Sequence, residues 1–564
     1  MAGRNMSQHL AAGSFTRRMT HQTHTGLGRV LLAITARRRV QIVAHILAGA
    51  LMLFSVVALN GRPVVFADTN IYDWMGQLEV RPLKYALNHL IGGPTTAASD
   101  PEAADETPHD MALRRTEMGA RSVWFGLYLY GVEAVGSLWL LAGLQCLFAS
   151  FCLEALWRFL QPPGRWGPFL VGMAGLSLGA TLPFFCGFAM PDVFLGLGLV
   201  ALYLLFTRWS ALGGPTRWGL SATLFAALAV HATNPPVLFV AAATLLCLRR
   251  FAKRPTLTPS ATLPWQWQRP AGLVVALWAL VLGLNLAYGA AIKVATGESL
   301  RSPPFLAARI LADGPGRTYL RTSCAQGVRW ALCRYAGTRL TDSQDILWSG
   351  NPTAGVFSRA DVATRKNIDR EQLAFVLDAV ASDPLGALRA AVGNAWTEAL
   401  SVYLDDPLRD PHFYLTDPDW RDTFIADMVH RLSDCDPDER GCRPTFTEAQ
   451  SRVWHSATCG LALLVIVFAL ASPNLRRSNG RHPEASRDVL EFAALVLVCL
   501  TANAVLTGGL SGPFARYQAR VSWLLPLAAI LILQARHGKG KDAAHISDEK
   551  ETGIPPQSAY APRQ

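Results

Sequence analysis

The chain has 564 residues, of which 51% are hydrophobic and only 16% are charged, and its formal net charge is +11. Soluble proteins carry about a quarter charged residues, so the composition argues against an ordinary soluble enzyme and for apolar surface in contact with lipid. The positive charge does not call for nucleic acid as a partner, because lysine and arginine gather in short connections between apolar runs, as membrane topology requires.

Ten apolar stretches are candidate transmembrane helices, since about 20 apolar residues in a helix cross the hydrocarbon layer. They are residues 41–59, 132–158, 168–186, 191–207, 217–233, 235–248, 271–293, 453–472, 488–508 and 519–535. The weakest is 235–248, which is short and has two prolines at its start. The pattern predicts an all-α polytopic membrane protein with about ten transmembrane helices and an inserted, mainly helical extracytoplasmic domain.

The distribution of basic residues indicates which side of the membrane each connection faces. The N-terminal tail to Arg39 has seven arginines and no acidic residue, and the connections 249–270 and 473–487 and the C-terminal tail are also basic. Ten spans place all four segments on one side, so the positive-inside rule puts both termini in the cytoplasm. Nine spans would separate 249–270 from 473–487 or leave one terminus outside. We expect an uncleaved, multi-pass protein of a bacterial inner membrane, because the basic region and apolar run exceed those of a signal peptide.

The domain organisation follows from this topology. In order, it consists of a basic cytoplasmic tail (1–40), the first transmembrane helix (41–59), an extracytoplasmic loop (60–121), transmembrane helices two to seven (122–293), an extracytoplasmic domain (294–452), helices eight to ten (453–537) and a cytoplasmic tail (538–564). In the loop, 68–90 has the spacing of amphipathic surface helices, and 91–110 has a disordered composition. In the domain, Asp369 and Asp383 are candidate helix N-caps.

Four of the ten cysteines, Cys324, Cys333, Cys435 and Cys442, fall in the extracytoplasmic domain. They form two close couples, which an oxidising periplasm would allow to close as disulfides. A zinc site is the alternative, but neither couple has CxxC spacing, so the sequence favours disulfides.

Charged residues gather where the spans should reach the outer surface. Arg516 and Arg520, around Tyr517, lie between the last two spans, and a guanidinium group suits a phosphate through two hydrogen bonds. An ion pair with an acid of the outer domain, or a contact with bulk phospholipid, is the equally weighted alternative. His231 and Asn234 lie at the same level, where a histidine is more often structural than a base.

Three aspartates, Asp68, Asp73 and Asp192, are expected at the same surface. A carboxylate beside apolar walls can take a proton from a hydroxyl group. The simpler interpretation of Asp192, next to Pro191, is a helix N-cap that contributes about 1 kcal/mol, and Asp68 has a similar alternative. No ATP-binding P-loop, HExxH or GxSxG motif is present.

The layout resembles the GT-C superfamily of integral membrane glycosyltransferases. In that family the loop after the first span carries a catalytic aspartate, matched here by Asp68 in ADTNIYD. An arginine–tyrosine pair precedes a late proline-bearing span, similar to Arg516 and Tyr517 before SWLLPL, and an outward acid often follows a middle span, as Asp192 could. The soluble domain departs from the commonest pattern, in which it is C-terminal.

The resemblance implies transfer of a sugar from a polyprenyl-phosphate donor to an acceptor at the outer membrane face, with Asp68 as base. It identifies no cofactor with certainty, and a divalent metal is one option. Membrane lipid and the polyprenyl-linked donor are the expected partners. The residues leave two alternatives open: a transporter or flippase of a lipid-linked or polar solute, and a non-catalytic assembly partner that docks through 294–452.

Overall fold

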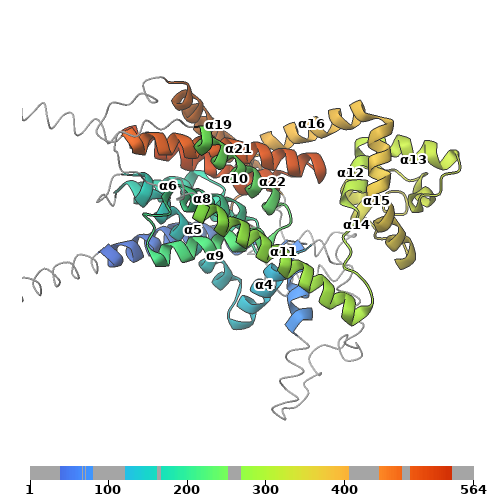
Figure 1. Ribbon diagram of the computed structural model, residues 1–564, viewed down its shortest axis with the longest axis horizontal. Coiled ribbons are helices and arrows are strands. Elements are labelled where there is room, and N and C mark those ends of the chain that lie inside the picture. The colour runs from blue at the N-terminus through green and yellow to red at the C-terminus, as the bar shows by residue number, and fades with distance from the viewer. Residues whose placement is uncertain are drawn as a thin grey trace, which may run out of the picture.

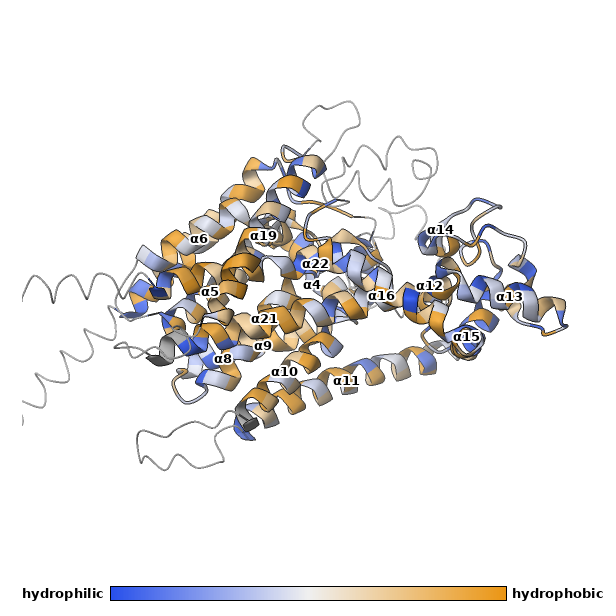
Figure 2. Ribbon diagram, turned by 90° about the horizontal axis from the view of Figure 1, so that it is seen from above, coloured by the Kyte–Doolittle hydropathy of each residue, from blue (hydrophilic) through white to orange (hydrophobic). Residues whose placement is uncertain are grey.

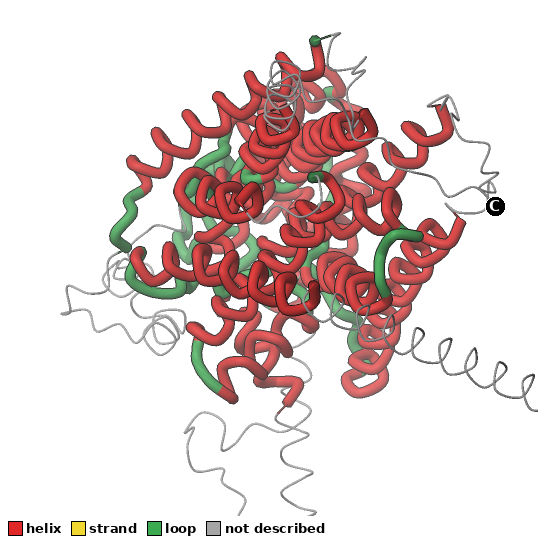
Figure 3. Tube along the Cα trace, turned by 90° about the vertical axis from the view of Figure 1, so that its left-hand side faces the viewer, coloured by secondary structure: helices red, strands yellow, loops and turns green. Residues whose placement is uncertain are grey.

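The computed structural model describes residues 38–66, 68–69, 71–80, 121–161, 167–251, 268–405, 444–472 and 483–536. In these ranges every regular element is a helix, and the strand-like pairing there is confined to an isolated bridge between Val64 and Phe188 (Figure 3). The prediction of an all-helical protein is therefore confirmed for the described part of the chain.

Six helices are long and apolar enough to cross a membrane, which indicates a membrane protein. They are Arg38–Leu59, Leu138–Leu160 (α5), Gln268–Thr296 (α11), Glu448–Ala471 (α19), Arg487–Leu510 within α21 (Pro483–Leu510), and Ala515–Arg536, which begins as α22 (Ala515–Ser522). Shorter helices occupy the other predicted spans. They are α6 (Gly167–Gly179), α7 (Leu182–Gly187), α8 (Val193–Arg208), α9 (Gly214–Val230) and α10 (Asn234–Phe251), and a further short helix, α4 (Val123–Val135), precedes α5.

Two of the predicted spans are broken helices. The stretch 132–158 contains the end of α4 and most of α5, with a break at Gly136 and Ser137. The stretch 168–186 divides into α6 and α7 at Thr181, because Pro183 cannot continue α6 and instead occupies the first turn of α7. Apolar composition alone did not show these breaks, since the residues on both sides are equally hydrophobic.

The main core is centred on α8. All its residues from Val193 to Phe206 are buried, as expected of a helix that is hydrophobic all round. Helices α5, α9, α10 and α22 pack against it (Figure 1). The core thus brings the ends of helices far apart in the sequence to one place.

A second core belongs to the distal helices, by which we mean α12 (Phe305–Asp313), α13 (Pro315–Ala325), η2 (Ala331–Tyr335), α14 (Ser343–Trp348) and α15 (Val362–Ser382). Leu311, Leu320 and Phe375 lie at its centre. Figure 1 shows these helices at one end of the molecule, and Figure 2 shows them with more hydrophilic residues than the helices of the main core.

Helix α16 (Pro384–Leu400) connects the two cores, because it packs along the end of α21. A Cβ atom on Gly508 would lie 2.7 Å from Cβ of Glu398, so only glycine allows this approach. The side of α16 away from α21 exposes an apolar stripe at helical spacing. It consists of Leu385, Leu388, Val392, Trp396 and Leu400.

Two predicted N-caps had different outcomes. Asp383 accepts a hydrogen bond from the amide of Gly386 at the start of α16, as predicted. The prediction for Asp369 is wrong: the cap of α15 lies eight residues earlier, at Asp361, which accepts from the amide of Thr364, and the helix begins at Val362.

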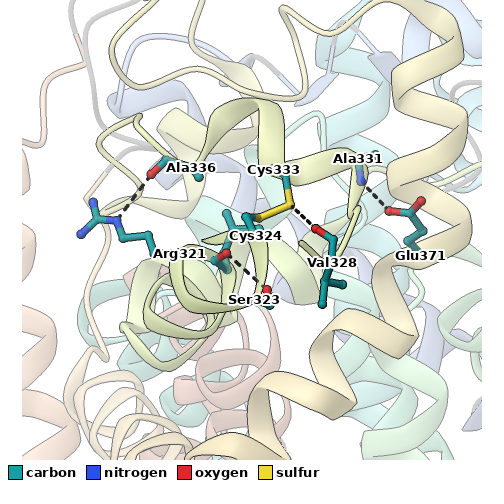
Figure 4. The surroundings of a disulfide bond; sticks show 9 residues. Arg321, Ser323, Cys324, Val328, Ala331, Cys333, Ala336 and Glu371 are labelled. Carbon is teal, nitrogen blue, oxygen red and sulfur yellow. Dashed lines mark hydrogen bonds between the residues drawn. A yellow bond between two sulfur atoms is a disulfide. The ribbon is translucent and has the colours of Figure 1, made fainter. Parts of the chain in front are cut away.

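The predicted Cys324–Cys333 disulfide is formed, with 5.7 Å between the two Cα atoms (Figure 4). It joins the end of α13 to η2, and the amide of Ala331 in η2 donates to Glu371 of α15 at 2.7 Å. Cys435 and Cys442 lie outside the described residues, as do the tails 1–37 and 537–564 and the acidic stretch 91–110.

The helix predicted after Asp68 is present over residues 71–80. One of its faces is buried: Tyr72, Met75 and Leu78 point into the protein, and a Cβ on Gly76 would lie 2.3 Å from the carbonyl oxygen of Gly126 in α4. This helix is therefore packed against α4, and residues 81–90 of the same prediction lie outside the described part.

Candidate functional site

Asp68 lies between two arginines from distant parts of the chain. Nη2 of Arg121 is 2.5 Å from Oδ1 of Asp68, and Nη2 of Arg516 is 3.0 Å from Oδ2. Each carboxylate oxygen therefore has its own guanidinium group. All three side chains are partly accessible, with 23% exposure for Asp68, so a ligand can reach this triad.

The triad sets the ionisation of Asp68. Burial alone would raise the pKa of its carboxyl group, but the guanidinium groups of Arg121 and Arg516 outweigh burial and hold the pKa well below its usual range. Asp68 in turn holds the pKa of Arg121 above its usual range, against the effect of burial. In the free protein Asp68 is thus an ionised carboxylate and a weak base.

Backbone contacts place Asp68 beside the turn that leads to Asp192. The amide of Val64 donates to the carbonyl of Gly187 at 2.9 Å, and the amide of Ala189 donates back to the carbonyl of Val64 at 3.0 Å. The hydroxyl of Thr69 donates to the carbonyl of Ala189 at 3.0 Å. This pairing fixes the segment after the first helix against the α7–α8 connection.

Helix α22 presents Arg516 and Arg520 on one face, because residues four apart in a helix are neighbours. The aromatic ring of Tyr517 lies against both guanidinium groups. Its centroid is 5.2 Å from Cζ of Arg516 and 5.3 Å from Cζ of Arg520. Arg516 also lies 4.9 Å from the ring centroid of Phe66. Cation–π contacts of this kind hold the two cations in place.

Arg520 is fully buried beneath the triad. Its Nη2 donates to Oδ1 of Asn503 and to Oγ1 of Thr233, both at 2.9 Å, and Nη1 is 3.6 Å from Oδ1 of Asp192. A distance of 3.6 Å makes the contact with Asp192 an ion pair and not a hydrogen bond. Arg520 therefore ties α22 to α21 and to the α9–α10 turn.

Asp192 does not have its expected structural role. It precedes α8, but its side chain makes no capping hydrogen bond. Within the described ranges neither of its carboxylate oxygens has a hydrogen-bond partner. Its neighbour is Arg520, so Asp192 supplies negative charge to the buried layer of the site.

His231 and Asn234 lie in the α9–α10 turn with different surroundings. The amide of Thr233 donates to Nδ1 of His231 at 3.2 Å, and the Thr233 hydroxyl lies 2.9 Å from the same nitrogen. Burial, reinforced by the charge of Arg520, lowers the pKa of His231 well below its usual value, so the imidazole is neutral. Asn234 is buried at the start of α10 and donates to the carbonyl of Ala227, which is a structural contact.

Asp73 lies on the helix over residues 71–80. It is buried, and its Oδ2 accepts from Nε2 of Gln77, one turn further along the same helix.

Glu398 of α16 is a further buried acid near Arg520, and no sequence pattern singled it out. Its side chain is fully buried, and burial raises the pKa of its carboxyl group to about 8, although Arg520 opposes the shift. Glu398 is thus neutral near pH 7. The site then holds three guanidinium groups against the carboxylates of Asp68 and Asp192, which leaves one positive charge for an anion.

Two pockets meet at Arg121. The α11 pocket, about 370 Å³, lies among α4, α9 and α11, and its lining includes Arg121, His231, Asn285 and Tyr288. The distal pocket, about 250 Å³, lies between the pair Ile71 and Arg121 on one side and the distal helices on the other, and its lining also includes Phe305, Trp348 and Asp369. Arg121 therefore connects the Asp68 triad with both pockets.

Sequence reasoning missed Arg121, Asn503 and Thr233. Arg121 had a usable signal, because the predicted topology puts this basic residue on the side that the positive-inside rule leaves poor in lysine and arginine. Asn503 had a weaker sequence signal, because it is a polar residue inside an apolar span. In the described part of the chain no three His, Cys, Asp or Glu side chains lie close enough together to hold a metal ion.

No family model, curated protein or solved structure matches this chain. The function therefore has to be argued from the geometry of the site.

Proposed function

We propose that the protein is a membrane glycosyltransferase that moves a sugar from a polyprenyl-phosphate donor to an acceptor hydroxyl group at the outer face of a bacterial inner membrane. The observation that carries the proposal is the ion pair between Asp68 and Arg516, 448 residues apart in the chain. It unites a candidate base and a candidate phosphate ligand in one accessible place.

The membrane arrangement that goes with this proposal has ten spans, with both termini in the cytoplasm. The six long helices are six of these spans, and α6 with α7, α8, α9 and α10 supply the other four. The distal helices and α16 then form the extracytoplasmic domain. The Cys324–Cys333 disulfide supports an extracytoplasmic location for these helices, because disulfides persist in oxidising compartments.

The donor is assigned to the α11 pocket. Its outer wall is α11, whose side chains are mostly exposed in the described structure, so a prenyl chain could enter from the lipid. Its inner end has Arg121 and the neutral His231. The excess positive charge around Asp68 suits the donor phosphate, which arginine forks bind through paired hydrogen bonds.

The reaction balances with groups of this chain. The acceptor oxygen attacks the anomeric carbon of the donor sugar, the bond from that carbon to the phosphate oxygen breaks, and the acceptor proton passes to Asp68. Polyprenyl phosphate leaves with the bonding electron pair. Arg121 and Arg516 offset the charge that grows on the departing phosphate, which is electrostatic stabilisation of the transition state.

Asp68 can act as base only if its arginines are drawn away from it. A donor phosphate offers Arg121 and Arg516 the same charge-assisted hydrogen bonds that Asp68 provides in the free protein. When the guanidinium groups turn to the phosphate, the main cause of the low pKa of Asp68 is removed, and the carboxylate becomes a stronger base. Donor binding would thus prepare the base.

The test is a transfer assay with the full-length protein and radiolabelled polyprenyl-phosphate sugars in lipid nanodiscs. Asp68→Asn should lower transfer by about 10²–10⁴-fold, the usual contribution of a placed base. Asp378→Asn, which changes an exposed aspartate of α15, is the matched control and should transfer normally. Near-normal transfer by Asp68→Asn, or no transfer by the wild type with any donor, would contradict the proposal.

A transporter or flippase of a lipid-linked solute is the second candidate. The broken helices at Gly136 and Thr181 favour it, because discontinuous helices often form transporter binding sites. Movement of a labelled lipid-linked sugar across proteoliposomes without transfer to an acceptor would support this alternative. If the protein shows neither transfer nor transport, the interpretation as a non-catalytic assembly partner remains.

A further inference from the structure

The donor is assigned to the α11 pocket, so the distal pocket, which shares only Arg121 with it, is left without a ligand. One wall is formed by Ile71 and Arg121, and the other by residues of the distal helices and their connections. A ligand in this pocket would therefore touch both parts of the protein. It would also lie one side chain from Asp68, since Arg121 lines the pocket and contacts Asp68 at 2.5 Å.

The size of the pocket limits its ligand. Sites for drug-sized molecules have volumes of about 300–1,000 Å³, and the distal pocket has about 250 Å³. It suits a single ring with small substituents better than a folded peptide or a long lipid chain.

Aromatic side chains dominate the distal wall. The rings of Phe305 and Trp348 have centroids 6.3 Å apart at an angle of 61°, and Trp348 keeps 37% of its surface exposed. Arg365 fixes the neighbouring segment of this wall, because it donates to the carbonyls of Phe357, Ser358 and Ala360. The exposed part of Trp348 leaves an aromatic face for a flat or ring-shaped ligand.

Polar groups at the edge of the pocket narrow the ligand class further. Arg301, Ser302 and Asp369 line it beside the aromatic residues. A purely hydrocarbon ligand would cover these groups without offering them hydrogen bonds, which is costly. A sugar ring offers an apolar C–H face for the aromatic side chains and hydroxyl groups for the polar edge.

We propose that the distal pocket binds one sugar ring of a saccharide acceptor, with the ring against Trp348 and Phe305 and its reacting hydroxyl group directed to Asp68. This inference rests on the proposed glycosyl transfer for its catalytic meaning, but the binding itself does not depend on transfer.

The test measures binding without a donor. Full-length protein in lipid nanodiscs is mixed with methyl glucoside or methyl glucuronide, and contact with the ring protons is followed by saturation-transfer NMR. Sugar-headed detergents are avoided because they would compete. Trp348→Ala should weaken binding about tenfold, whereas Trp396→Ala, which removes an exposed tryptophan of α16 outside the pocket, should leave it unchanged.

A second variant approaches the pocket from the opposite wall. Ile71→Trp fills the space while Trp348 stays in place, so it should abolish sugar binding. Binding of neither sugar, or equal binding by the Trp348→Ala and Trp396→Ala variants, would overturn the inference. Sugar binding by a protein that transfers nothing would support this pocket and contradict the proposed enzyme. Transfer with an acceptor KM that Trp348→Ala leaves unchanged would contradict this pocket alone.

Discussion

Asp68 competes with any phosphate for the same two guanidinium groups. In Asp68→Asn the neutral amide keeps the shape of the side chain but not its charge, so Arg121 and Arg516 lose their internal anion. Inorganic phosphate should then bind about 10- to 100-fold more tightly than in the wild type, because a hydrogen bond to a charged group contributes about 1.5–3 kcal/mol. The measurement is the phosphate-dependent rise in Tm, which reports affinity.

The Asp378→Asn variant again serves as control for this measurement and should respond to phosphate like the wild type. Sulfate at the same ionic strength separates specific binding from screening. If phosphate raised the Tm of Asp68→Asn and of the wild type by equal amounts, competition between carboxylate and phosphate would be refuted.

Arg516 and Arg520 differ in burial, and their substitution by lysine should separate binding from stability. Arg516 is 12% exposed, so Arg516→Lys should fold normally and raise the donor KM about tenfold, because an ammonium group lacks the planar fork. Arg520 is fully buried and holds Asn503 and Thr233, so Arg520→Lys should lower Tm. The lysine keeps the positive charge but not the fork that reaches both partners, and each lost hydrogen bond from a charged group costs about 1.5–3 kcal/mol.

Thermal unfolding and donor titration of the two variants check this division. An unchanged donor KM in Arg516→Lys would favour a purely structural ion pair with Asp68. An unchanged Tm in Arg520→Lys would mean that the buried layer does not hold α22 against α21.

At the scale of elements, the docking of α16 on α21 should depend on pH through Glu398. Burial raises the pKa of this carboxyl group from 4.5 to about 8 in the folded protein, so the folded state binds more protons than the unfolded state between these values. Stability should therefore fall as pH rises from about 4.5 to 8, by up to about 1.4 kcal/mol per pH unit, and level off above 8.

Glu398→Gln removes this titration while keeping the size of the side chain. The slope of Tm against pH over this range should be smaller in the variant than in the wild type, and the variant should be the more stable of the two at pH 9. Parallel pH profiles would show that Glu398 does not titrate in this range.

Local signals allowed some elements to be predicted and not others. The start of α16 was predictable because Asp383 and Pro384 form a cap within one turn. The start of α15 was missed because its first two turns, VATRKNID, are polar and have no apolar periodicity to mark a helix. The two broken spans were missed for the opposite reason, since uniform hydrophobicity conceals a break.

The site was predictable in part for a related reason. Span ends and charge bias indicate which residues share a membrane surface, and this placed Asp68, Asp192, Arg516 and Arg520 together. They do not indicate which of those residues touch. The contact of Arg121 with Asp68 depends on how the helix at 71–80 packs against α4, which is a tertiary contact that no local pattern encodes.

At the scale of the whole molecule, the proposed function requires the triad, both pockets and the distal helices on one side of the membrane. With ten spans, the ends of α10 at Phe251 and of α19 at Ala471 face the cytoplasm, and the end of α11 at Thr296 faces outward. Truncations after these three residues, each fused to alkaline phosphatase or to a fluorescent protein, report the side of each end, since the phosphatase folds only outside and the fluorescent protein is bright only inside.

Ten spans predict a phosphatase signal after Thr296 and fluorescence after Phe251, after Ala471 and at the end of the full-length chain. With nine spans, at least one of these ends would lie on the other side of the membrane. The basic connections 249–270 and 473–487 would then lie on opposite sides, or one terminus would lie outside. A phosphatase signal after Phe251 together with fluorescence after Thr296 would place the distal helices in the cytoplasm. That result would remove the oxidising compartment that supports the Cys324–Cys333 disulfide and the external site on which the proposed transfer depends.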